Sequence, residues 1–196
     1  AAVAAFSGRA PDGGEIVPQL QSVSRCCGDH ALVSVFAGYH PDDMRNLPAH
    51  QVLEALGGLL QMGVPRIFLT GLPVHEGCAR ELIRRAGVPE DRVGWVSPAG
   101  FLEFVHLVAG ARVVFSTDSV AAHLACALDV PLVAVLAGAH YGEFAPWGRP
   151  GRQIWLTHEL PCFGCDWRCP YPVPECIRGI APGEVARALE VLGRVV

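Results

Sequence analysis

Short apolar runs alternate along this chain with longer segments whose hydrophobic positions recur at helical spacing. The apolar runs, each short enough for a strand buried on both faces, lie at 31–37, 66–70, 93–96, 113–115, 132–137 and 153–157. The helical segments lie at 48–60, 76–86, 97–109, 119–130 and 182–192. Strands that alternate with helices in this way predict an α/β fold with a doubly wound, Rossmann-like parallel sheet.

Side-chain direction follows from the same spacing. In the helix at 76–86, the spacing places Cys78, Leu82 and Ile83 toward the sheet, and Gly87 is expected to end the helix. The last helix is expected to turn Val185 and Leu189 inward.

The segment from 113 to 137 is predicted to form a strand, a polar turn, a helix and a second strand. Asp118 lies in the turn, and His123 follows Ser119 by four positions, so the three side chains are expected to converge at the carboxyl edge of the sheet. Ligands of parallel sheets bind at that edge. The alternative is that Asp118 only caps the helix and that His123 is a half-buried histidine with its hydrogen bonds satisfied.

The sequence STDSVAAHLACALDVPLVAVLAG resembles the donor-binding signature of the family-nine glycosyltransferases, the heptosyltransferase-like enzymes. The matching positions are Asp118, Ser119, His123, Leu124, Ala125, Ala127, Leu128, Val130 and Pro131. Two positions depart from the family pattern, since Val120 and Asp129 stand where the family usually has glycine. A glycine at position 120 would let a phosphate approach the backbone closely, and the valine side chain adds bulk there.

The loop after the first strand is expected at the same edge. In the family, a lysine followed by an apolar residue and proline contacts the donor phosphates, and Arg45-Asn46-Leu47-Pro48 is similar to that motif, with arginine as the cation. Arginine can bind phosphate through two hydrogen bonds. The alternative for Arg45 is an ion pair with Asp42 or Asp43 on a solvated loop.

The loop that follows the fifth strand, residues 138–144, is also similar to one branch of the family. Gly138 would allow a close backbone approach, and His140 and Tyr141 can line the site of a sugar or a base. The alternative is a well-packed connector.

Four cysteines lie within fifteen residues near the carboxyl end. Their spacing is C-x2-C-x3-C-x6-C, formed by Cys162, Cys165, Cys169 and Cys176. Four thiolates can close a tetrahedral zinc site. Reduced thiols in a proline-stiffened loop and disulfides are the alternatives, and a cytosolic setting argues against disulfides. The family often has several cysteines here, which supports membership without identifying a metal.

Composition limits the classes of function. Hydrophobic residues make up 51% of the chain and charged residues 17%, which is typical of a globular protein with a large core. A net charge of −4 gives no reason to expect a nucleic acid as partner. No apolar run reaches the roughly 20 residues of a transmembrane helix, and the start does not resemble a signal peptide. We therefore expect a cytoplasmic location, which includes the inner face of the membrane for a peripheral protein.

The resemblance covers residues 31–196 and implies the carboxyl-terminal half of a GT-B type glycosyltransferase. Residues 1–29 are expected to be a linker or the remnant of a preceding domain, and residues 30–196 a nucleotide-sugar-binding domain with a cysteine-rich loop at 162–176. The donor-binding residues that it implies are Arg45, Thr117, Asp118, Ser119, Val120, His123, Gly138, His140 and Tyr141.

The activity implied by the resemblance is the transfer of a sugar, for example heptose from ADP-heptose, to bacterial lipopolysaccharide or another glycan or lipid-linked acceptor. The resemblance implies that catalysis requires no cofactor, and the catalytic base is expected in the missing amino-terminal half. Two alternatives remain, a non-catalytic nucleotide-sugar-binding module and a domain of a sugar-nucleotide epimerase. The bulk of Val120 favours the first of these alternatives.

Overall fold

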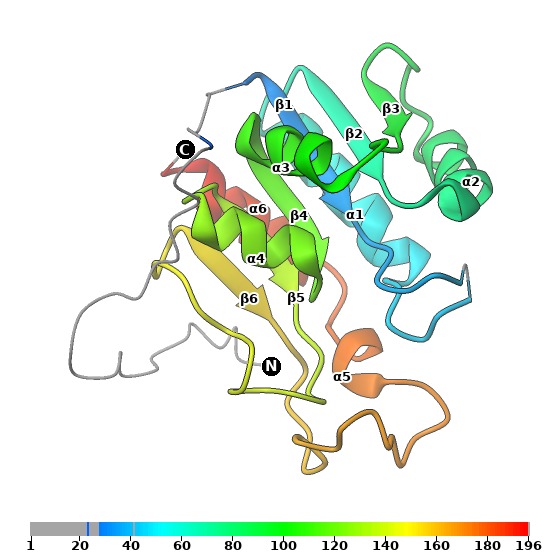
Figure 1. Cartoon of the computed structure of the whole chain (residues 1–196), viewed down its shortest axis with the longest axis vertical. Coiled ribbons are helices and arrows are strands. Elements are labelled where there is room, and N and C mark those ends of the chain that lie inside the picture. Colours follow the sequence, from blue (N-terminus) through cyan, green and yellow to red (C-terminus); the bar gives the residue numbers. More distant parts are fainter. Residues whose placement is uncertain (1–22, 24–27, 41, 196) are drawn as a thin grey trace.

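The structure is a computed structural model that describes residues 23, 28–40 and 42–195, so most of the predicted linker at 1–29 lies outside the described residues. Within the described part, six parallel strands form one sheet in the order β3-β2-β1-β4-β5-β6 (Figure 1). The strands are β1 (His30–Ser34), β2 (Arg66–Thr70), β3 (Val93–Val96), β4 (Ala111–Thr117), β5 (Leu132–Val135) and β6 (Gln153–Leu156). The doubly wound α/β fold is therefore confirmed.

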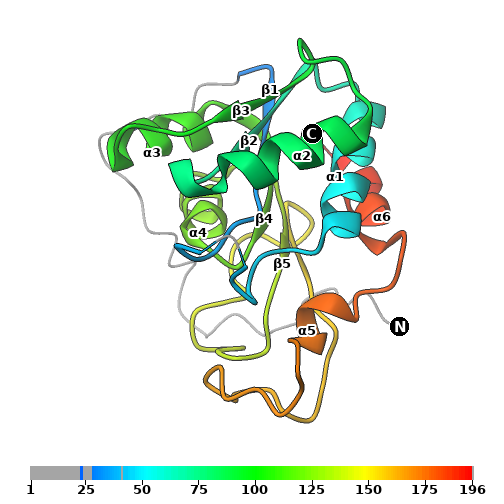
Figure 2. The same ribbon diagram turned by 90° about the vertical axis from the view of Figure 1, so that its right-hand side faces the viewer.

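Helices cover both faces of the sheet (Figure 2). One face packs against α1 (Ala49–Gln61), α2 (Glu76–Ala86) and α6 (Glu184–Gly193), and the other packs against α3 (Phe101–Ala109) and α4 (Val120–Ala127). Two short elements complete the described chain, η1 (Pro73–His75) and α5 (Glu175–Arg178). Among the described residues, no helix combines the length and the apolar character that crossing a membrane requires.

Two apolar cores hold these layers together, because the strands are buried on both faces. One core joins Leu56, Phe115 and Leu189, and the other joins Leu32, Val114 and Leu132. Burying one such side chain stabilises a fold by roughly 1.5–3 kcal/mol.

Several details of the sequence prediction differ from the structure. Cys78 is exposed, so its inward placement was wrong. The buried stripe of α2 runs through Ala79, Leu82 and Ile83, which share one face at helical spacing, and Cys78 falls about 100° away from that face. Another difference is that α3 begins at Phe101 rather than at Ser97.

The polar turn before α4 is shorter than the sequence suggested. Ser116 and Thr117 belong to β4, where they lie opposite Ala134 and Val135 of β5. Their hydroxyls are buried and have partners, since Ser116 Oγ donates to the Ser34 carbonyl at 3.0 Å. The turn that remains consists of residues 118 and 119.

The order of the strands fixes where a ligand can bind. The chain proceeds from β1 outward through β2 and β3 and then returns to place β4 on the other side of β1. Loops that leave β1 and β4 therefore diverge, and the crevice between them opens at the carboxyl ends of the strands. In Figure 1 this edge lies at the bottom of the sheet, on the side of α5.

Candidate functional site

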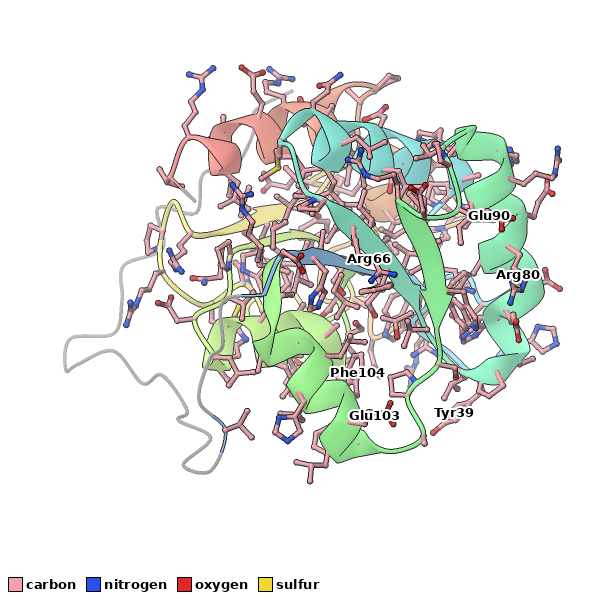
Figure 3. All side chains as sticks on the ribbon, turned by 90° about the horizontal axis from the view of Figure 1, so that it is seen from above. Tyr39, Arg66, Arg80, Glu90, Glu103 and Phe104 are labelled. Carbon is pink, nitrogen blue, oxygen red and sulfur yellow. The ribbon has the colours of Figure 1, made fainter. Side chains whose placement is uncertain are left out.

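A cleft with a volume of about 520 Å³ opens at the carboxyl edge between β1 and β4. Segments after β1, β2 and β3 line it together with the start of α4. Much of its wall is apolar, with Phe36, Leu72 and Pro98 among the lining residues. Tyr39 and Phe104, both labelled in Figure 3, belong to the same lining. A largely apolar cleft with a few polar groups is typical of a small-molecule site.

The first turn of α4 reaches this cleft through Ser119 and Val120. Ser119 is the N-cap residue, but its side chain makes no capping hydrogen bond, and its hydroxyl lies 3.1 Å from Ser116 Oγ instead. The amide groups at the start of a helix carry a partial positive charge and favour anions. Val120, the first residue of the helix, is 50% exposed.

Asp118 and His123 lie beside each other, as their spacing predicted. His123 Nε2 is 3.5 Å from Asp118 Oδ1, and both side chains are partly buried. On its other side, His123 Nδ1 accepts a hydrogen bond of 2.9 Å from the indole N–H of Trp147. His123 also borders a second hollow, of about 560 Å³, which is otherwise lined by residues 142–147.

Arg45 lies at the same edge but is already paired. Asp43 accepts hydrogen bonds from Nε and Nη2 of Arg45 at 2.8 and 2.7 Å. These bonds raise the pKa of Arg45 and hold the pKa of Asp43 below its usual value. The carbonyl of Arg45 accepts a hydrogen bond of 3.2 Å from Thr117 Oγ1, which ties the loop to the end of β4. The structure therefore contains the ion pair that was the alternative for Arg45, and Asp43 is the partner.

Gly138 is close to another part of the chain rather than to either hollow. A Cβ atom at this position would overlap the ring of Phe163, which comes from the cysteine-rich loop. The amide of Gly164 donates to the Gly138 carbonyl at 2.8 Å. Glycine at 138 is thus required by the packing of that loop.

His140 and Tyr141 also contact the cysteine-rich loop. His140 lies between two carboxylates, with Nδ1 at 3.2 Å from Glu143 and Nε2 at 3.5 Å from Asp166. The ring of Tyr141 packs at 5.1 Å from that of Phe163. These contacts fit the alternative of a packed connector, whereas residues 142–147 of the same loop line the second hollow.

The four clustered cysteines are free thiols in the structure. Burial raises the pKa of Cys176, on which Cys162 and Cys169 act electrostatically, so these three lie near one another. Within the described part of the chain, however, no three His, Cys, Asp or Glu side chains are grouped so that they could hold a metal ion. The arrangement does not support zinc, which stays a prediction of the spacing alone, and elemental analysis of protein purified without chelators tests it.

Two lining residues of the cleft were missed by the sequence analysis. Thr70 ends β2 and His75 ends η1, and both are almost fully buried. His75 Nδ1 accepts the amide of Leu72 at 3.2 Å, while Nε2 has no hydrogen-bond partner, and the same is true of Thr70 Oγ1. Burial lowers the pKa of His75, although the nearby Gly38 backbone partly offsets this effect. In the sequence, the feature that marks this part of the edge is Gly71, a glycine directly after β2 that also lines the cleft.

Asp129 shows how the second departure from the family pattern is accommodated. Its φ angle is 54°, in the left-handed region that favours glycine. Its carboxylate pairs with Arg149 at 2.9 Å and with Arg152 at 3.1 Å. Aspartate tolerates this conformation better than most residues, and the two arginines form ion pairs with its carboxylate.

The strand order and the cleft define a doubly wound α/β domain with a cleft at its switch point. The profile of glycosyltransferase family 9 (heptosyltransferase) matches residues 54–169, which is more than half of the chain, so the chain belongs to this family. Comparison with curated protein sequences found no match.

Solved structures of bacterial glycosyltransferases are similar to the chain. E. coli heptosyltransferase WaaC with ADP-2-deoxy-2-fluoro heptose is 26% identical with a TM-score of 0.52, over 71% of this chain and 40% of that one. E. coli ADP-heptose LPS heptosyltransferase II is 19% identical with a TM-score of 0.63, over 89% and 49%. The iron-containing dodecameric glycosyltransferase TibC of enterotoxigenic E. coli is 16% identical with a TM-score of 0.64, over 90% and 48%. The chain thus spans less than half the length of each of these proteins.

Proposed function

We propose that this chain is the donor-binding part of a glycosyltransferase and that its cleft binds a nucleoside diphosphate sugar. The observation that carries the proposal is the position of the cleft, where an apolar wall and the helix start of α4 meet at the switch point between β1 and β4. The similar heptosyltransferase WaaC binds ADP-2-deoxy-2-fluoro heptose in its solved structure, which supports a donor of that class. An ADP-linked sugar, heptose among others, is therefore the donor that we propose first.

Each part of the donor has a counterpart at this edge. The apolar wall formed by Phe36, Leu72 and Phe104 suits a nucleoside. The helix start at Ser119 and the guanidinium of Arg45 suit the diphosphate, because both favour negative charge. Asp43 keeps two of the guanidinium nitrogens occupied and so fixes the plane in which Arg45 meets a phosphate.

The proposed reaction is attack of an acceptor hydroxyl on the anomeric carbon of the sugar. The bond from that carbon to the phosphate oxygen breaks, the nucleoside diphosphate leaves, and a base accepts the hydroxyl proton. Arg45 and the α4 helix start would stabilise the charge that develops on the leaving diphosphate. We propose that the base and the acceptor surface belong to a second domain, with a bacterial glycan or lipid-linked molecule such as lipopolysaccharide as acceptor at the cytoplasmic face of the membrane. No observation favours the epimerase alternative.

Calorimetric titration of the chain with ADP tests the site. Val120→Glu should abolish or strongly weaken binding, because it adds a carboxylate where the diphosphate is expected. Val191→Glu is the matched control, since Val191 is also helical and is 48% exposed compared with 50% for Val120, and it should bind like the wild type. Equal affinity of the two variants for ADP would contradict the proposed phosphate position, and no binding of ADP or of any nucleotide sugar by the wild type would contradict the function.

A further inference from the structure

The hydrogen bond between Trp147 and His123 determines which nitrogen of His123 carries the proton. The planes of the two rings are nearly parallel, with an interplanar angle of 16°, and Nε1 of Trp147 lies 2.9 Å from Nδ1 of His123. An indole nitrogen can only donate a hydrogen bond. Nδ1 must therefore be the acceptor, and a neutral His123 carries its proton on Nε2.

The proton on Nε2 faces Asp118. The distance from Nε2 to Asp118 Oδ1 is 3.5 Å, which is longer than an ordinary hydrogen bond. Pairs of this length in a binding site often shorten when a ligand binds. Trp147 donates to His123, and the remaining proton of His123 then points toward Asp118, so one side chain outside the α4 turn sets the polarity of the series.

Trp147 is itself held by groups outside the donor cleft. Its carbonyl accepts a hydrogen bond of 2.9 Å from the indole of Trp155, a buried residue of β6, and one of 3.5 Å from Cys126 Sγ on α4. It does not line the cleft between β1 and β4, although it borders the second hollow. His123 does not line that cleft either, but it lies beside Asp118, which directly precedes the lining residue Ser119. The hydrogen bond to His123 is thus the contact of the indole N–H that leads toward the cleft.

We propose that Trp147 is a positioning residue for the donor site, which holds His123 as the Nε2–H tautomer and thereby orients the carboxylate of Asp118. The role for the donor rests on the proposed function, whereas the tautomer does not. In Trp147→Phe the ring remains but the N–H is lost, so neither nitrogen of His123 is favoured as the acceptor. Asp118 then loses a fixed donor.

Nitrogen NMR of ¹⁵N-labelled protein at a pH where histidines are neutral measures the tautomer directly. The wild type should show His123 with an unprotonated Nδ1, and comparison with His123→Gln assigns the signals. Trp147→Phe should give a mixture of tautomers, while Trp147→Gln, whose amide can donate, should restore part of the wild-type pattern. Trp95→Phe is the control, since Trp95 contacts Phe36 and not His123, and it should leave these signals unchanged.

Binding of ADP-glucose and ADP to the same variants separates a positioning role from a purely structural one. In this proposal the carboxylate of Asp118 binds hydroxyls of the sugar, so Trp147→Phe should weaken ADP-glucose several-fold more than ADP. If His123 of the wild-type protein is protonated on Nδ1, the inference is overturned. This result needs no variant, so it holds even if Trp147→Phe does not fold. If the wild type shows the expected tautomer but Trp147→Phe binds ADP-glucose with unchanged affinity, only the positioning role is overturned. The positioning role is also overturned if the wild type binds ADP but not ADP-glucose, and nucleotide binding then still stands. A wild type that binds neither ligand would refute the proposed function together with the positioning role, and the tautomer result would still stand.

Discussion

Single residues in the site depend on neighbours that the sequence pattern does not reveal. Arg45 was expected at this edge because it follows a strand and precedes a proline, and the hydrogen bond of its carbonyl to Thr117 places it there. Its two bonds to Asp43 join residues of the same loop, and this ion pair was one of the expected alternatives. The ring of Trp167, whose centroid lies 5.9 Å from the guanidinium carbon, comes from a distant loop and was not predictable from the sequence.

Replacing Arg45 should weaken binding of the diphosphate. Arg45→Ala is expected to lower ADP affinity by roughly 1.5–3 kcal/mol, the value of a hydrogen bond to a charged group. Asp43→Asn should have a smaller effect, because the guanidinium remains but is less well oriented. Titration calorimetry measures both. Arg80→Ala is the control, since Arg80 pairs with Glu76 on α2, and a comparable loss there would contradict a specific role for Arg45.

At position 129, substitution by glycine should be less destabilising than substitution by alanine, which is the reverse of the usual order. Asp129→Ala loses the ion pairs and forces alanine into the left-handed region, whereas Asp129→Gly loses only the ion pairs. The alanine variant should therefore unfold with a free energy about 1–2 kcal/mol lower than that of the glycine variant. Urea denaturation of the two proteins measures the difference. An alanine variant as stable as the glycine variant would show that the backbone at 129 relaxes.

The elements were predicted well where periodicity is strong and poorly where loops pack on loops. Both β2 and α2 have the expected bounds, and Gly87 ends α2 with a φ of 64°. The short helix α5 and the contact between Gly138 and Phe163 were not predicted, since neither produces a hydrophobic period. For the same reason, His75 was missed, although its burial and its unpartnered nitrogen make it a feature of the cleft.

The docking of the cysteine-rich loop on the end of β5 should depend on the absence of a side chain at position 138. Gly138→Ala is expected to destabilise the protein by about 1–3 kcal/mol, because the added Cβ overlaps the Phe163 ring. In a Phe163→Ala background the same change should cost less than about 1 kcal/mol, and this coupling is the test in a double-mutant cycle measured by urea denaturation.

Gly57→Ala is the control for this cycle, since nothing lies within 4 Å of a Cβ atom at that helical position. It should be neutral or slightly stabilising. Additive effects of the changes at 138 and 163 would contradict the proposed contact.

At the scale of the whole molecule, stability should depend on pH through His75. Burial lowers the pKa of His75 in the folded state, so the unfolded state takes up a proton first as the pH falls below about 6.5. The contribution of His75 to stability is complete above that pH and decreases as the pH falls toward the folded pKa. Calorimetry between pH 7 and 5 should show a decrease in melting temperature that is shallower in His75→Asn, whose oxygen can still accept the Leu72 amide. Parallel curves for the two proteins would contradict this assignment.

The pairing of β1 with β4 has a consequence for the order in which this protein becomes competent to bind. Their first partners, His30 and Ala111, are separated by all of β2, β3 and the helices between them. A chain emerging from the ribosome cannot form the crevice until β4 and α4 have been synthesised, and contacts of such long range form slowly during folding. A donor molecule therefore meets no site on the nascent amino-terminal portion. A bound donor would contact segments from both sides of the switch point. It is therefore expected to slow unfolding, in which these segments separate, and not to speed up folding, in which they first meet.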